Sequence, residues 1–234
     1  MSERSAGAGA QRIDGRDIRW NDHRAERHER VLRTALTAIE RDGADVGVAS
    51  IADEAGIPRS VVYRLFRNRE DLDEHIRARI IDDLMVALTP ALDPKGTVRD
   101  AIRCATETYV GWVAEHPRLH QFLGTGSATR RRTGSRVVTG TRTAIALHLW
   151  ELLDQHLAAL VPAGPVPPGT SENVAFGMIG LVDGAGNRWV SHPESRSSAE
   201  ELTSFLSDAL WGVLTGAAAR LGLDIDPELR VGPA

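Results

Sequence analysis

The stretch Ile51–Phe66, IADEAGIPRSVVYRLF, decides the fold class, because it predicts two short helices joined by a tight turn. Ala52 and Gly56 lie four residues apart, so a small side chain lets a second helix pack closely and glycine can adopt the left-handed turn conformation. Val62 and Phe66 are also four apart, and we expect them to face the core from the second helix. The pattern predicts a helix-turn-helix.

The opposite face of the second helix is polar and basic. It presents Ser60, Tyr63, Arg64 and Arg67 at spacings of three, four and seven residues, and positions 59 to 69 contain no acidic residue. Arginine can bond guanine with two hydrogen bonds, while tyrosine hydroxyls and further arginines can bind phosphates. This face therefore suits a helix in the DNA major groove. An ordinary helical corner with a solvated charged face is the alternative for the same pattern.

The flanking sequence predicts helices throughout. Apolar residues at helical spacing, the N-cap residues Asn68 and Thr97, and Gly or Pro at helix ends set the boundaries. The expected helices cover residues 22–42, 48–55, 58–66, 68–88, 97–115, a short stretch from 117, 145–160, 171–191 and 199–221. Residues 124–143 are expected to be a loop or a frayed helix start, and 162–169 a linker. With no convincing strand, the chain is expected to be all-α, with about nine helices.

Length and composition exclude several classes of protein. The 234 residues are 42% hydrophobic and 26% charged, the balance of a globular protein with a sizeable core. Only 5% are aromatic and alternating apolar runs are scarce, which disfavours a β-sandwich or barrel. The single cysteine, Cys104, excludes an internal disulfide and fits a reducing compartment. With no signal peptide and no apolar run near the roughly 20 residues that span a bilayer, we expect a cytoplasmic protein without a membrane partner.

The charge pattern indicates a local anionic contact rather than a wholly basic protein. The net charge is −4 and the isoelectric point about 6.1, so the basic segment at positions 59 to 69 belongs to a chain that is acidic as a whole.

The sequence gives no reason to expect an enzyme. We find no G-x-S-x-G, no H-E-x-x-H, no P-loop and no paired cysteine motif, so no catalytic residues and no cofactor are expected. His116 and His120 are four apart, but Pro117 interrupts the helix and only Glu115 offers a third ligand. No metal site is predicted.

Three motifs carry a resemblance to a known family: RVLRTALTAIERDG at residues 30–43, A-G-I-x-x-x-x-x-Y at 55–63, and F-x-N-R-E-D-L at 66–72. Together they resemble the DNA-binding domain of TetR-type transcriptional regulators over residues 28–72. The resemblance implies DNA contact by six residues: a recognition surface of Arg59, Ser60, Val61, Tyr63 and Arg64, with Arg69 as a phosphate clamp.

Three departures from the family pattern affect the expected phosphate contacts. Gly47 stands where the family usually has a threonine that caps the first helix of the motif and touches phosphate. Pro58 stands where a serine usually caps the recognition helix, and the loop after Gly43 is one residue short. Glycine still caps acceptably and proline fits a helix start, so the fold is expected to survive.

The resemblance also implies the organisation of the whole chain. We expect a flexible N-terminal arm at 1–21, a helix-turn-helix domain at 22–72 whose fourth helix continues to about 88, an effector-binding and dimerisation domain at 73–224, and a C-terminal tail at 225–234. A homodimer through the last two helices is implied, and Gly177, Gly180 and Gly184 would allow close helix approach there. Two core helices of one monomer are the alternative for that pattern.

The middle helices are implied to enclose a pocket for an unidentified small-molecule effector. The candidate contacts are large or polar groups at otherwise apolar positions: Trp112, Phe122, His148, Trp150, Met178 and Asp183. Ordinary core packing is the alternative for each of them.

The function implied is that of a ligand-responsive repressor, released from a palindromic double-stranded DNA operator when effector binding tilts the helix at 68–88. The alternative from a different class is a helical protein-binding adaptor that docks an acidic partner on its arginine face. Salt dependence and base preference would separate the two.

Overall fold

The computed structural model describes residues 15–91, 96–124, 135–160 and 167–231, and this part of the chain forms nine α-helices. They are α1 (Gly15–Asp42), α2 (Val48–Glu54), α3 (Arg59–Leu65), α4 (Arg69–Leu88), α5 (Val98–Glu115), α6 (Pro117–Gly124), α7 (Arg136–Leu160), α8 (Thr170–Ser191) and α9 (Ala199–Ala219). A 3-10 turn, η1 (Thr89–Ala91), follows α4, and β1 (Gly96–Thr97) pairs antiparallel with β2 (Arg230–Val231). The all-α prediction is confirmed.

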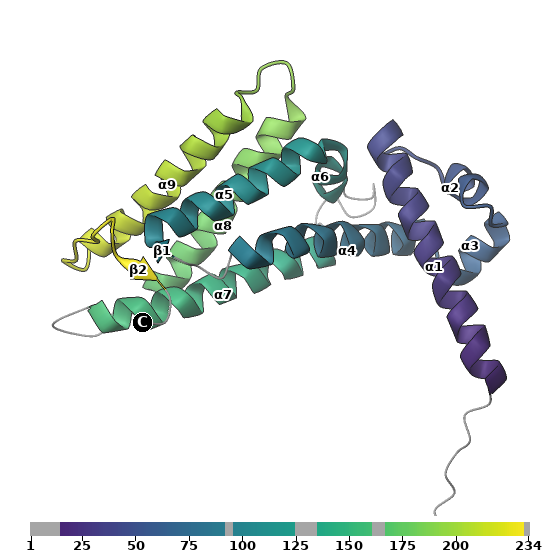
Figure 1. Ribbon diagram of the computed structural model, residues 1–234, viewed down its shortest axis with the longest axis horizontal. Helices are drawn as coiled ribbons and strands as arrows, with labels where there is room; N and C mark the ends of the chain where they lie inside the picture. The colour runs from purple at the N-terminus through teal and green to yellow at the C-terminus, as the bar shows by residue number, and fades with distance from the viewer. Residues whose placement is uncertain (1–14, 92–95, 125–134, 161–166, 232–234) are drawn as a thin grey trace, which may run out of the picture.

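Helices α1 to α3 form one end of the molecule, and α5 to α9 form the body at the other (Figure 1). The helix-turn-helix is closed by Gly56, whose φ of +64° lies in the left-handed region, and by a 3.0 Å hydrogen bond from the Ile57 N–H to the Ala52 carbonyl. Phe66 is fully buried between His28 of α1 and His75 of α4, with ring centroids 4.7 Å and 5.3 Å away. These contacts fix the angle at which α3 leaves the core.

Helix starts follow the capping residues read from the sequence. The Asn68 side chain accepts a 2.8 Å hydrogen bond from the Asp71 N–H, and Thr97 forms a capping box with Asp100. Gly47 and Pro58 cap α2 and α3 without any side-chain hydrogen bond. The two departures from the family pattern therefore leave the helices intact, and neither helix has a capping side chain at its start.

Helix α4 connects the two parts of the molecule (Figure 1). Its twenty residues span about 30 Å, and it packs against α1 at one end and against α5, α6 and α7 farther on. Leu72, Ile76, Ile80 and Leu88 are buried along it. A single rigid element thus runs from the helix-turn-helix into the body.

Two expected boundaries were wrong, and a third is now placed. Helix α1 begins at Gly15 rather than Asp22, which shortens the predicted arm. Helix α7 begins at Arg136, inside the segment expected to be a loop or a frayed helix start. Extending a helix that has already nucleated costs little, so residues without an apolar period can join it. Residues 225–231 are not a free tail, because β2 pairs with β1 and Ile225 is buried.

The rest of the predicted arm, residues 1–14, and the linker residues 162–166 lie outside the described residues. Across the described ranges, no helix combines the length and the hydropathy needed to cross a membrane.

Candidate DNA-recognition surface and effector cavity

The outer face of α3 carries five of the six predicted DNA contacts. Arg59, Ser60, Tyr63 and Arg64 are exposed and Val61 is half-buried, while Val62 between them points into the core. The seven residues of α3 include no acid. The surface therefore presents two arginines and two hydroxyls without a competing carboxylate on the same helix.

Arg59 and Tyr63 are already associated with each other. Nη2 of Arg59 donates a 3.3 Å hydrogen bond to the Tyr63 hydroxyl, and its guanidinium lies 5.5 Å from the ring centroid. This contact orders both side chains on the exposed face, where the tyrosine ring restrains the arginine.

Arg69 differs from the other five, because much of its guanidinium is used inside the protein. Nε donates to Asp73 at 2.8 Å and Nη1 donates to the Val46 carbonyl at 2.6 Å. These bonds tie the loop before α2 to the first turn of α4. These two bonds use two of the five N–H groups of the guanidinium and leave the others for a phosphate, so Arg69 also positions the helix-turn-helix on α4.

A cavity of about 650 Å³ lies in the body, walled by residues from every helix from α4 to α9. This volume is within the range of small-molecule sites, as is its mostly apolar lining. Three of the six predicted effector residues line it: His148, Met178 and Asp183.

The other three candidates lie elsewhere. Trp112 is buried against His116, with ring centroids 5.1 Å apart, and Phe122 is buried beneath the Arg77 guanidinium at 5.0 Å. Trp150 is half-buried on α7 and does not line the cavity. Helical spacing predicts that such residues are buried, but it does not distinguish packing against a neighbouring helix from facing a void.

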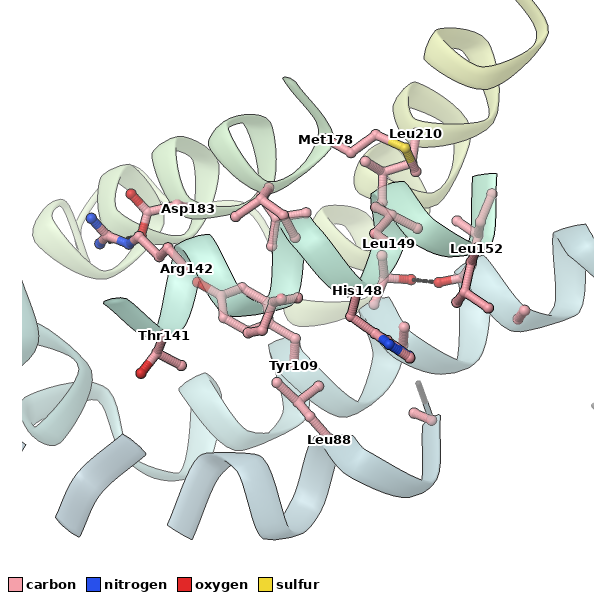
Figure 2. A pocket seen from close by; sticks show the side chains of 18 of the residues that line it. Leu88, Tyr109, Thr141, Arg142, His148, Leu149, Leu152, Met178, Asp183 and Leu210 are labelled. Atoms are coloured by element: carbon pink, nitrogen blue, oxygen red, sulfur yellow. Dashed lines mark hydrogen bonds and ion pairs between the residues drawn. The ribbon is translucent and has the colours of Figure 1, made fainter. Parts of the chain in front are cut away.

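One end of the cavity is polar. The Tyr109 hydroxyl of α5 lies 3.0 Å from Nε2 of His120 on α6, and Arg142 of α7 forms an ion pair with Asp183 of α8. Figure 2 shows Arg142 and Asp183 side by side next to the Tyr109 ring. Asn187 lies one helical turn beyond Asp183 and lines the same cavity.

The tyrosine and the histidine at this end are neutral at pH 7. Burial lowers the pKa of His120 to about 4, with Asp183 opposing the effect and Arg142 adding to it. Burial also raises the pKa of the Tyr109 phenol, and the negative charge of Asp183 raises it further. Nδ1 of His120 is buried and, within the described residues, has no hydrogen-bond partner.

Gly186 of α8 makes room for this polar pair. A Cβ at that position would lie 2.3 Å from the Tyr109 hydroxyl, closer than any side chain tolerates. Sequence patterns do not identify Tyr109, Arg142 and Gly186 as members of this group, because the group is assembled from four different helices. The buried glycine within a helix was the one available signal.

The other end of the cavity is apolar. It is lined by residues of α4, α5, α7, α8, α9 and the C-terminal segment, among them Leu84, Leu88, Ile102, Leu149, Leu153, Met178, Leu210, Leu214, Ile225 and Leu229. The C-terminal segment is held there by a 2.9 Å hydrogen bond from the Val98 N–H to the Leu229 carbonyl. The segment expected to be a tail is therefore part of the cavity wall.

The two histidines considered as a metal pair have other partners. His116 Nδ1 lies 2.5 Å from the Glu40 carboxylate of α1, and His120 contacts Tyr109. No group of three potential metal ligands occurs in the part of the chain that the structure describes.

The outer faces of α8 and α9 are open in the single chain. Phe176 and Phe205 are 40% and 57% exposed, and a Cβ built at Gly177, Gly180 or Gly184 would meet nothing within 4 Å. In contrast, Leu202, Leu206, Leu210 and Leu214 of α9 are buried within the monomer. The two last helices thus use one face for the core and leave the other uncovered.

Comparisons with known proteins match this architecture along most of the chain. The family described as bacterial regulatory proteins, tetR family, matches residues 31–76, and the tetracyclin repressor-like C-terminal domain matches residues 87–224. An HTH-type transcriptional regulator of Mycobacterium tuberculosis is 29% identical over 211 residues, which cover 88% of this chain and 84% of the relative.

Solved structures agree on the fold. A tetR-family transcriptional regulator from Streptomyces coelicolor has a TM-score of 0.65 at 23% identity, covering 85% of this chain and 86% of that one. The fatty acid degradation regulator FadR from Bacillus halodurans has a TM-score of 0.59 at 15% identity, covering 81% and 95%. With both family domains matched in order, the chain belongs to the TetR family and is a DNA-binding transcriptional regulator.

Proposed function

We propose that this regulator is a repressor that leaves a palindromic operator when a small molecule fills the cavity of the body. The proposal rests on the position of α4, which extends from the recognition helix to the cavity. This helix begins at Arg69, next to the recognition helix, and its last turns place Leu84 and Leu88 in the cavity wall. A ligand that displaces these leucines tilts a rigid rod whose far end holds the helix-turn-helix.

A second contact ties the cavity to the DNA-binding end. His116 and Arg118, at the junction of α5 and α6, bond to Glu40 and to the Arg41 carbonyl at the end of α1. His120, one turn farther on, lines the cavity. The coupling between ligand and operator should therefore be in the usual allosteric range, about 1–3 kcal/mol.

On DNA, residues of the α3 surface are assigned both to base edges and to backbone phosphates. Arg64, exposed and without a partner carboxylate on its helix, is assigned to a base edge, where a guanine would accept two hydrogen bonds. Tyr63 and Arg69 are assigned to phosphates, and Arg59, Ser60 and Val61 complete the surface.

A homodimer through α8 and α9 would place two such surfaces on one face of the DNA. The exposed Phe176 and Phe205 and the open glycine face of α8 support this interface, since small residues allow two helices to approach closely. Two-fold symmetry then matches an inverted repeat whose half-sites lie one or more helical turns, roughly 34–36 Å each, apart.

The family match favours this function over the protein-binding adaptor, and a regulator of this kind acts in the cytoplasm, where the DNA is. The two hypotheses differ in solution. A repressor prefers one DNA sequence and loses affinity steeply with salt, whereas an adaptor shows no base preference.

The test is release from an operator isolated by selection from random duplex DNA. A library of small molecules is screened for release, and each active compound is tested again on Met178→Trp, which fills the cavity from α8. We expect this variant to bind the operator and to resist release. Release of the variant at the same concentration as the wild type would place the effector site outside the cavity.

A further inference from the structure

The cavity is elongated along α7. Residues that line it recur from Arg142 through Ile145 and Leu149 to Leu153, a span of about 16 Å at 1.5 Å per residue. Beyond Arg142 this wall is apolar except for His148, which lies on the exposed side of α7 near Leu88 (Figure 2). A straight alkyl chain of about a dozen carbons fits that length.

The polar end carries no net charge. The positive charge of Arg142 is compensated by Asp183, and the Tyr109–His120 pair is neutral. A carboxylate or an ammonium group entering this end would lose part of its hydration and would find both possible counter-charges, Arg142 and Asp183, already paired with each other. An uncharged head group meets neither cost.

Within the described residues, the polar end also holds a buried hydrogen-bonding atom that has no partner and can serve such a head group. The hydroxyls of Thr106 and Thr141 donate to helix carbonyls, and the Tyr109 hydroxyl contacts His120. His120 Nδ1, in contrast, is buried and has no partner among the described residues. Depending on the tautomer it donates to an ester or ketone oxygen, or accepts from a hydroxyl.

We propose that the effector is an uncharged, elongated amphiphile: an alkyl chain that ends in one oxygen-bearing group such as an ester, a ketone or an alcohol. The chain would lie along α7 toward Leu153 and Leu210, and the oxygen would lie beside His120. This inference rests on the proposed function of the cavity and adds the chemical class of its ligand.

The test compares three probes with the same chain and different head groups: methyl decanoate, decanoate and decylammonium. Each is titrated into the purified full-length protein by calorimetry, the ester below its solubility limit and the two charged probes below their micelle concentrations. Methyl decanoate should bind at least tenfold more tightly than either charged probe. In a series of methyl esters, each added CH₂ should tighten binding about fourfold until the chain fills the cavity.

A charge substitution sharpens the test. Asp183→Asn leaves Arg142 without its counter-charge, so decanoate should bind the variant at least tenfold more tightly than it binds the wild type. The matched control is Asp208→Asn, which removes the same charge from an ion pair with Arg99 on the outside of α9 and should leave all three affinities unchanged. If Asp183→Asn does not fold, the inference is tested by the order of the three probe affinities for the wild type.

The inference is overturned if decanoate binds the wild type as tightly as the ester, or if none of the probes binds. Calorimetry needs no DNA, so it tests the chemical class of the ligand independently of the proposed repressor function. An ester that binds without releasing the operator would contradict the proposed function and support the ligand class. A carboxylate that binds more tightly than the ester and releases the operator would support the proposed function and contradict the ligand class.

Discussion

Replacing His120 by glutamine should remove a pH dependence of stability that the wild-type chain owes to one buried imidazole. His120 is 4% exposed, and burial lowers its pKa from 6.5 to about 4 in the folded protein. As the pH falls below 6.5, the unfolded chain takes up a proton that the folded chain cannot accept until about pH 4. Unfolding is therefore favoured across this window, and the stabilisation present above pH 6.5 is lost by pH 4.

The expected size follows from the two pKa values. At about 1.4 kcal/mol per tenfold change in proton affinity, the fall from 6.5 to about 4 corresponds to about 3 kcal/mol. The carboxylates titrate in both proteins, so they cancel when the free energy of unfolding of His120→Gln is subtracted from that of the wild type. This difference should decrease by about 3 kcal/mol between pH 7 and pH 4.

The measurement is urea unfolding of both proteins at several pH values and one protein concentration, since a dimer's stability depends on concentration. Tyr109→Phe provides a control, because it removes the hydroxyl near Nε2 but keeps the imidazole buried, and its pH dependence should resemble that of the wild type. A wild-type minus His120→Gln difference that is flat from pH 7 to pH 4 would refute the burial of a neutral histidine.

Three further predictions concern packing, assembly and recognition. Gly186→Ala should destabilise the fold by about 1–3 kcal/mol in urea unfolding, since the new Cβ meets the Tyr109 hydroxyl at 2.3 Å. Adding Tyr109→Phe should restore part of the lost stability. A double variant as unstable as Gly186→Ala alone would contradict this contact. Phe205→Glu should shift the protein to monomers in sedimentation experiments, and an unaltered dimer would move the interface away from this face of α9. Arg64→Ala should weaken operator binding by about 1–3 kcal/mol and relax the preference at one base pair in titrations of single-base operator variants. Unchanged affinity and preference would show that the recognition face is misplaced.

The DNA-binding end could be predicted closely because its signals are local. The turn at Gly56, the buried Phe66 and the cap at Asn68 each follow from residues within a few positions of one another. Local patterns of this kind specify both the elements and the face that is exposed.

The cavity could be predicted only in part, because its wall is assembled from distant segments. Met178 and Asp183 stand out in the sequence as unusual residues in apolar helices, but the partner of Asp183 is Arg142, from a segment expected to be a loop or a frayed helix start. Trp112 and Phe122 have the same helical spacing and are buried against neighbouring helices instead. Which buried residues face a void depends on how the helices are assembled, and that information is not local in sequence.

The most direct test of the central claim is selection of bound sequences from random duplex DNA by the purified protein at moderate salt. A TetR-family repressor acting as the proposed dimer should enrich one inverted repeat, and Arg64→Ala should enrich that repeat less strongly, with the preference relaxed at one base pair of each half-site, while retaining its helical content. Enrichment of no sequence by the ligand-free protein, or equal enrichment by Arg64→Ala, would contradict recognition of an operator through the outer face of α3.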